Sequence, residues 1–164
     1  MTTMLTPQIT EQAIDAFRAA LGPDAVLTGD EDLRSFRDPF AFSTWDDYTA
    51  SAVLLPQTVE EIQAVVRLAN EHRVPLWTHG AGMNNGYGGP APRVDGSLIV
   101  SLRNMNKVLE IDEELAYAVV EPGVRWFDLY DTVRAGNHRL MVSIPDLGWG
   151  SVVGNFLENG ATDL

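Results

Sequence analysis

Apolar positions near the start of the chain recur at the spacing of a helix. They predict a helix from about Pro7 to Leu21, with Thr6 as its N-cap. The apolar stripe of this helix consists of Ile9, Ala13, Ile14, Phe17 and Leu21. Gly22 follows and ends it, and a second, short helix is expected to hold Leu33 and Phe36.

The middle of the chain has the pattern of a strand, a helix and a second strand. The apolar run 52–55 predicts the first strand, and Val74–Trp77 predicts the second. Between them, Thr58 and Glu61 have the spacing of a capping box, followed by apolar positions at helical spacing. Strands joined in this way pair in parallel with a right-handed crossover. The segment after Trp77 is therefore expected at the carboxyl end of a parallel strand, where ligand crevices of α/β sheets usually lie.

The second half of the chain alternates strands with one clear helix. Strands are expected at 97–102, 108–111 and 116–120. An amphipathic helix follows, which carries Trp126, Leu129, Tyr130 and Val133 and stops near Gly136. The last segment, from Leu140, is expected to begin as a strand and then becomes rich in glycine.

The stretch "THGAGMNNGYGG", residues 78–89, concentrates glycine and asparagine after a predicted strand. A phosphate-binding P-loop is excluded, because its motif ends in lysine and the only lysine of the chain is Lys107. A Rossmann site is also unlike this loop, because the glycine spacing differs and no helix pattern follows the glycines. A backbone nest, in which successive N–H groups converge on an anion, suits the composition, and Asn84 and Asn85 tolerate its left-handed geometry. A glycine-rich connection without a ligand remains the alternative.

Composition excludes several classes of function. The chain has 23 acidic and 11 basic residues, and its formal net charge is −12. Nucleic-acid binding needs a basic surface, so no nucleic-acid partner is expected. The absence of cysteine excludes disulfides and a thiolate nucleophile, which makes the cytoplasm the default location. No apolar run reaches the ~20 residues of a membrane span, no signal peptide is expected, and the histidines lack metal-ligand spacing.

Five segments together resemble a known family. They are "PQTVEEIQAVVRLANEHRVPL", "NNGYGGPAPR", "MNKVLEID", "EPGV" and "PDLGWGSVVGN". In this order they resemble the FAD-binding domain of the vanillyl-alcohol oxidase and 4-cresol dehydrogenase family, and the "GWGS" version is most similar to the eugenol oxidase branch. The resemblance runs from about Asp38 to Gly160. It implies an α+β fold, the PCMH-type FAD-binding domain, built from a strand-helix-strand subdomain and the start of a second mixed sheet.

The resemblance also implies roles for single residues. The pyrophosphate loop would consist of His79, Gly80, Ala81, Gly82, Met83, Asn84, Asn85 and Gly86. Tyr87 would contact the phenolate oxygen of a substrate, and Asp146 would lie beside the reactive edge of the flavin. The flavin-contacting positions would be Pro145, Ser151, Gly154 and Asn155. Without the resemblance, the residues favour a loop aromatic at Tyr87 and turn-forming roles for Asp146 and Asn155.

The family members are far longer than this chain, so the resemblance predicts a truncated domain. Residues 1–50 would form an N-terminal helical arm, and residues 51–164 a PCMH-type domain that is incomplete at its C-terminus. The leading hypothesis is the FAD-binding part of an oxidoreductase for para-substituted phenols, with a hydride passing from the substrate to flavin. The full-length form would be a homo-oligomer, and the isolated chain would be inactive. The alternative is a non-catalytic nucleotide-binding or subunit-interaction module, or an inactive relic.

Overall fold

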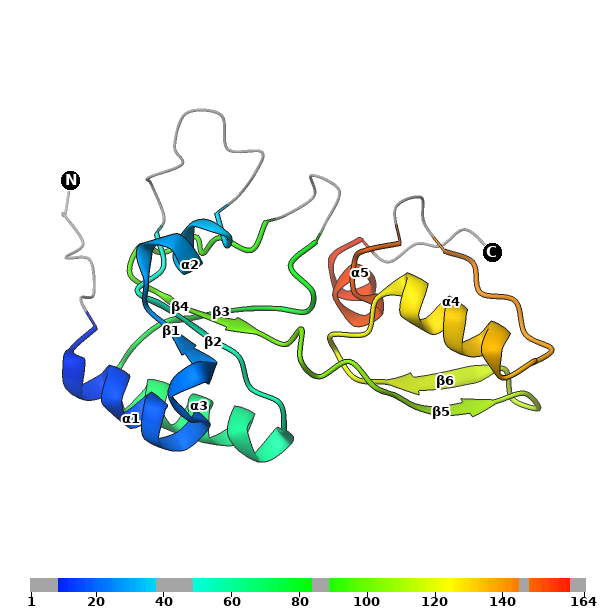
Figure 1. Ribbon diagram of the computed structural model, residues 1–164, viewed down its shortest axis with the longest axis horizontal. Coiled ribbons are helices and arrows are strands. Elements are labelled where there is room, and N and C mark those ends of the chain that lie inside the picture. The colour runs from blue at the N-terminus through cyan, green and yellow to red at the C-terminus, as the bar shows by residue number, and fades with distance from the viewer. Residues whose placement is uncertain (1–8, 38–48, 84–88, 145–147, 160–164) are drawn as a thin grey trace. The chain divides into compact units, whose positions relative to one another are not determined.

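The protein has two units, each of which is described by itself. The structure, a computed structural model, describes residues 9–37, 49–83, 89–144 and 148–159 (Figure 1). Unit 1 comprises residues 1–79 and 89–101, and unit 2 comprises residues 80–88 and 102–164. The mixed content of helices and strands confirms the α+β class. The domain boundary expected near residue 50 stays a prediction.

Unit 1 contains a four-stranded sheet in the order β1-β2-β4-β3 (Figure 1). Its strands are β1 (Val26–Leu27), β2 (Ala52–Leu54), β3 (Leu76–His79) and β4 (Leu98–Ser101). β2 and β3 both pair with β4 in parallel, whereas β1 pairs with β2 in an antiparallel way. The predicted direct pairing of β2 with β3 is wrong, because β4 lies between them. β4 is buried along its whole length, as expected for a central strand of a covered sheet.

Two longer helices and two short ones complete unit 1. They are α1 (Glu11–Leu21), the 3-10 turn η1 (Pro23–Ala25), α2 (Asp30–Arg34) and α3 (Val59–His72). α1 begins later than predicted, because the hydroxyl of Thr10 accepts a hydrogen bond from Ala13 N at 3.2 Å and so caps the helix there. The capping threonine of α3 is Thr58, as predicted. The Glu61 carboxylate accepts from Gln57 N at 2.6 Å, one residue before the cap.

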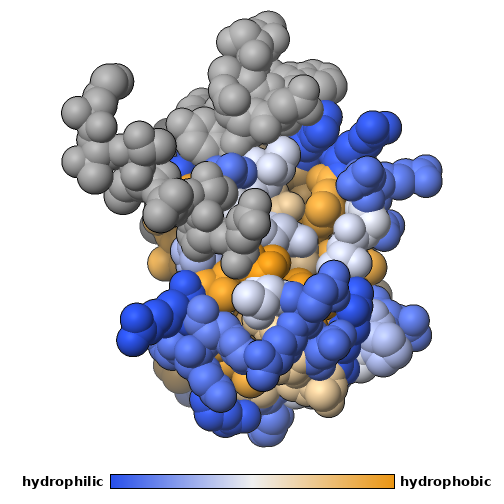
Figure 2. Space-filling model, turned by 90° about the vertical axis from the view of Figure 1, so that its left-hand side faces the viewer, coloured by the Kyte–Doolittle hydropathy of each residue, from blue (hydrophilic) through white to orange (hydrophobic). Residues whose placement is uncertain are grey.

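The core of unit 1 forms around the sheet. Phe36, Val53 and Ile99 make a buried cluster, against which further partly buried apolar residues pack. Phe17 of α1 and Val65 of α3 are fully buried, which follows from the apolar stripes of these helices. Figure 2 shows that hydrophilic residues dominate the lower part of this face of the molecule, where α1 and α3 lie in Figure 1.

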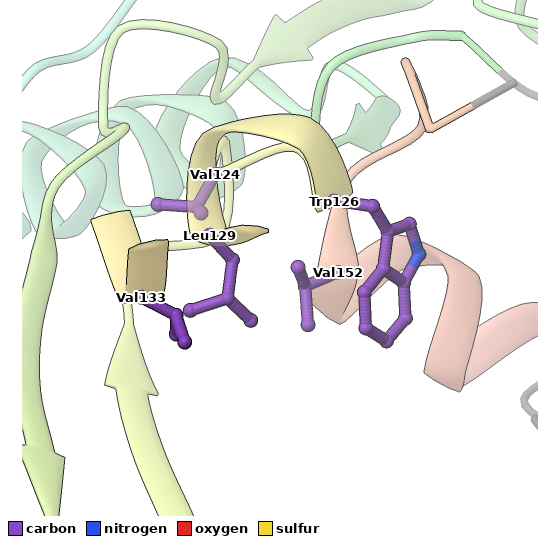
Figure 3. Packing of buried hydrophobic residues seen from close by; sticks show 5 residues of the cluster. All are labelled: Val124, Trp126, Leu129, Val133 and Val152. Atoms are coloured by element: carbon purple, nitrogen blue, oxygen red, sulfur yellow. The ribbon is translucent and has the colours of Figure 1, made fainter. Parts of the chain in front are cut away.

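Unit 2 is built from a hairpin and two helices. The strands β5 (Val108–Asp112) and β6 (Tyr117–Val120) pair in an antiparallel way, and α4 (Trp126–Ala135) and α5 (Val152–Asn159) follow. The buried core cluster consists of Val124, Trp126, Leu129, Val133 and Val152. Figure 3 shows Val152 of α5 between Leu129 and Trp126 of α4. Contacts across this cluster therefore join the C-terminal helix to α4.

The structure of the last part of unit 2 differs from the sequence-based prediction. Residues 140–144 form no strand, although their apolar character predicted one, and Leu140, Val142 and Ile144 instead pack against the core cluster. α5 was not predicted at all, because the glycines around its start masked its helical spacing. Among the described residues, no helix is long and apolar enough to cross a membrane.

Candidate cofactor-binding site

The segment 148–152 is joined to the start of α4 by backbone hydrogen bonds. Val152 N donates to Val124 O at 2.8 Å, Trp126 N to Gly150 O at 3.1 Å, and Phe127 N to Gly148 O at 3.0 Å. Arg125 and Ser151 form an isolated antiparallel bridge between the same two segments. These hydrogen bonds hold the "GWGS" stretch, whose first residues form a turn, beside the start of α4.

Ser151 connects this stretch to α5. Its hydroxyl accepts a hydrogen bond from Gly154 N at 3.3 Å, and its carbonyl accepts from Asn155 N at 2.9 Å. These are the contacts of an N-cap residue, and they satisfy backbone groups at the start of the helix. Ser151 is only 6% exposed. The sequence expectation that Ser151 contacts flavin is not tested by this geometry, which shows a capping role.

The start of the glycine loop lies against Ser151. A Cβ atom added at Gly80 would overlap the Ser151 hydroxyl and would come within 2.6 Å of Pro122 O. On the other side, a Cβ added at Gly150 would meet Met83 O at 2.9 Å. Residues 80–83 therefore pack directly on residues 150–151, and only glycine fits at the points of closest approach. Two segments about seventy positions apart in the sequence thus form one backbone surface.

Gly82 has a left-handed backbone, with φ of +71°. Side chains other than glycine rarely adopt this conformation. In a nest, a left-handed residue follows or precedes a right-handed one, so that successive N–H groups point toward the same side. The left-handed backbone at Gly82 is compatible with the nest hypothesis, which stays a prediction.

The motif "EPGV" supports the other side of this surface. Gly123 N donates to Met105 O at 2.8 Å, and a Cβ atom added at Gly123 would overlap Leu102 O. The tight packing at Gly123 fixes the neighbouring Pro122, whose carbonyl oxygen faces Gly80. Sequence reasoning quoted "EPGV" only as part of a family resemblance and missed this supporting role.

One ion pair stands beside the site. The Arg125 guanidinium donates to both carboxylate oxygens of Asp128, from Nε at 2.7 Å and from Nη2 at 2.6 Å. This hydrogen bonding raises the pKa of Arg125 and lowers the pKa of Asp128. The Arg125 guanidinium also lies 5.4 Å from the centre of the Trp149 ring. The sequence analysis assigned no role to Arg125 or to Trp149, although Trp149 belongs to the quoted "GWGS" motif.

The expected site residues divide into three groups. His79 is the last residue of β3 in unit 1, and its ring lies 6.1 Å from that of Phe36. Residues 80–83 and 151–155 belong to unit 2, where the loop packs on Ser151. The remaining candidates, Asn84, Asn85, Gly86, Tyr87, Pro145 and Asp146, lie outside the described residues. No group of metal-ligating side chains occurs within the described ranges.

A family comparison identifies the class of this protein. The FAD binding domain family matches residues 50–163. The chain therefore belongs to this family, and FAD is the cofactor of the domain. The backbone is compatible with such a cofactor, since a left-handed glycine, as at position 82, occurs in anion-binding nests.

Several curated proteins are similar to this chain over most of its length. It is 38% identical over 151 residues to the 4-cresol dehydrogenase flavoprotein subunit of Pseudomonas putida. This alignment covers 91% of this chain and 29% of that protein. It is 39% identical over 160 residues to 1'-carboxy-chondrochloren decarboxylase of Chondromyces crocatus, covering 95% and 28%. It is 31% identical over 161 residues to glycolate oxidase subunit GlcD of Bacillus subtilis, covering 95% and 32%. The chain thus spans less than a third of the length of these relatives.

Solved structures share the fold. A substrate-bound p-cresol methylhydroxylase matches with a TM-score of 0.88 and 36% identity, over 93% of this chain and 30% of that one. The 4-ethylphenol oxidase of Gulosibacter chungangensis in complex with isoeugenol matches with a TM-score of 0.89 and 38% identity, over 96% and 31%. These neighbours confirm the predicted PCMH-type domain, and with it a family of flavoprotein oxidoreductases that includes 4-cresol dehydrogenase.

Proposed function

We propose that this chain is the FAD-binding part of an oxidoreductase that acts on para-substituted phenols. The observation that carries the proposal is the packing of residues 80–83 on residues 150–151, because it joins the two glycine-rich segments in one backbone surface. The similarity to 4-cresol dehydrogenase and to 4-ethylphenol oxidase supports the phenolic substrate.

The residues of this chain would divide the work of the site. The loop from His79 to Gly86 would bind the FAD diphosphate through backbone N–H groups, with Gly82 providing the left-handed turn. Ser151 would hold the loop against the start of α5, whose positive dipole end favours an anion nearby. The remaining flavin-contacting positions would be Pro145, Gly154 and Asn155.

Two further residues would act on the substrate. Tyr87 would donate a hydrogen bond to the phenolate oxygen, which stabilises the ionised substrate. Asp146 would hold or exchange a proton near the reactive edge of the flavin, since a carboxylate can take either role. Bound FAD would accept the hydride that the benzylic carbon of the substrate gives up.

A pair of chimeras tests the substrate class. In one, residues 1–164 replace the matching part of the 4-cresol dehydrogenase flavoprotein subunit, and in the other they replace the matching part of glycolate oxidase subunit GlcD. At equal FAD content, the proposal expects 4-cresol to bleach the flavin of the first chimera under anaerobic conditions. It also expects Tyr87→Phe to raise the KM for 4-cresol there. Flavin that stays oxidised in the first chimera contradicts the proposal.

A second candidate is the oxidation of 2-hydroxy acids. It is favoured by the similarity to GlcD, which extends over 95% of this chain. Bleaching by glycolate in the GlcD chimera alone would select this candidate. FAD binding without reduction in either chimera would favour the non-catalytic module instead.

Assembly and location belong to the same proposal. A homo-oligomer in the cytoplasm is expected from the family resemblance and from the absence of cysteine. Sedimentation velocity of the FAD-loaded chimera measures the first of these expectations, and a monomer at micromolar concentration contradicts it.

A further inference from the structure

Trp149 is half-exposed and yet is held on two sides. The rings of Phe127 and Trp149 form an edge-to-face pair, with centroids 5.1 Å apart and an interplanar angle of 88°. The Arg125 guanidinium lies 5.4 Å from the centre of the indole ring. Both geometries are attractive arrangements for an aromatic ring. We call Arg125, Phe127 and Trp149 the aromatic clamp.

The cation of the clamp is itself fixed. The Asp128 carboxylate accepts two hydrogen bonds from the Arg125 side chain and a third, at 3.1 Å, from Arg125 N. A bidentate pair of this kind restricts the guanidinium to one orientation. Arg125 therefore acts as a fixed partner for the Trp149 ring.

The aromatic clamp also holds the backbone on either side of Trp149. A Cβ atom added at Gly148 would lie 2.8 Å from the Phe127 ring, so the ring packs closely on the chain there. On the other side of Trp149, Gly150 packs on Met83 O, and Ser151 packs on Gly80. Trp149 thus lies between one backbone position that packs on Phe127 and two that pack on the loop 80–83.

We propose that Trp149 is a positioning residue for the cofactor loop. Held by Arg125 and Phe127, it presses the backbone of residues 150–151 against residues 80–83 and keeps that loop in the conformation that binds FAD. This inference rests on the proposed function, in which the loop receives the FAD diphosphate. Half of the Trp149 side chain is exposed, so burial in a core does not explain a large apolar residue at this position. The positioning role gives a reason for it.

Hydrogen exchange in the cofactor-free chain tests the coupling without FAD. Trp149→Leu keeps an apolar side chain but removes both ring interactions, whereas Trp149→Phe keeps a ring for Phe127 and Arg125. We expect Trp149→Leu to speed amide exchange at residues 80–83 about tenfold, because one ring pair and one cation–π contact are lost. Trp149→Phe should restore most of the protection, and Leu115→Ala, a change at an exposed residue of the same unit, should have no effect.

FAD titration then connects the coupling to the cofactor. The affinity of the Trp149→Leu chain for FAD, measured by quenching of flavin fluorescence, should fall by about the same tenfold factor, because a loop that is less often in its binding conformation binds proportionally less well. Arg125→Met provides a second variant that keeps Trp149 and should show a smaller loss in both measurements. Faster exchange confined to residues 148–152, with residues 80–83 unchanged, would overturn the inference.

The two proposals fail in different ways. If Trp149→Leu speeds exchange in the loop but leaves FAD affinity unchanged, the loop is not the FAD site, and both the proposed diphosphate assignment and the inference are wrong. If Gly82→Val weakens FAD binding while Trp149→Leu changes neither exchange nor affinity, the diphosphate assignment stands and the aromatic clamp has no positioning role.

Discussion

Replacing Gly80 by alanine should disrupt the contact on which the proposed site depends. The new Cβ would overlap the Ser151 hydroxyl, lie 2.7 Å from Ser151 Cβ and lie 2.6 Å from Pro122 O. The hydroxyl could rotate away, but Pro122 O belongs to the backbone and is held by the tight packing at Gly123. The strain is therefore relieved by movement of the loop or is borne by the folded unit.

The size of the effect follows from overpacking. Forcing an extra methyl group into a well-packed contact costs about 1–3 kcal/mol. If displacement of the loop relieves the strain, this cost appears as a loss of FAD affinity of about 5- to 150-fold. If the loop keeps its place, the same cost lowers the free energy of unfolding of unit 2 instead.

Two measurements on the 164-residue chain separate these outcomes. FAD affinity is obtained from flavin fluorescence, and the free energy of unfolding from denaturant titration followed by tryptophan emission. Gly29→Ala is a matched control, because its new Cβ would meet only the flexible carboxylate of Asp32, at 3.1 Å, in unit 1. A Gly80→Ala chain with the parent's FAD affinity and the parent's stability would refute the packing argument.

Three other changes have expected outcomes of their own. Ser151→Ala removes the cap of α5 and should lower the free energy of unfolding by about 1 kcal/mol, measured by denaturant titration, whereas Ser151→Thr should retain most of it. The hydrogen bonds from Arg125 lower the pKa of Asp128 below its ordinary value of 3.8, so this pair stabilises the folded state above that value. Stability should therefore fall as the pH drops below 3.8 through the lower folded-state pKa, and Asp128→Asn should flatten that part of the pH–stability curve; an unchanged curve contradicts the linkage. In the 4-cresol dehydrogenase chimera, Asp146→Asn should shift the flavin potential and slow flavin reduction, and parental values for both would leave Asp146 as a turn residue.

The sequence by itself determined most of the local structure. Helical spacing of apolar residues predicted α1, α3 and α4, because each helix buries one stripe against a core. The strand runs 97–102 and 108–111 contain β4 and most of β5. Thr58 was predicted as a cap, since a threonine followed three residues later by glutamate satisfies the free N–H groups of a helix start. These features depend on neighbours within a few residues, so sequence patterns report them directly.

Only the tertiary structure decided which strands are neighbours. A strand-helix-strand pattern predicts that β2 and β3 run parallel, but it says nothing of a later strand that enters between them. β4 takes that place, with Ile99 opposite both Val53 and Trp77. The choice depends on which apolar run fills the centre of the sheet, and that is a property of the whole unit.

The candidate site shows the same division. The sequence identified the glycine-rich loop and the "GWGS" stretch as separate candidates, because composition marks both as unusual. It left unanswered why position 80 needs glycine, since the reason is the approach of Ser151 and Pro122 from distant parts of the chain. The "GWGS" motif did not reveal what Trp149 contacts, because its partners Arg125 and Phe127 lie more than twenty residues away. Contacts of this kind arise when the folded backbone brings segments together, so only the tertiary structure reveals them.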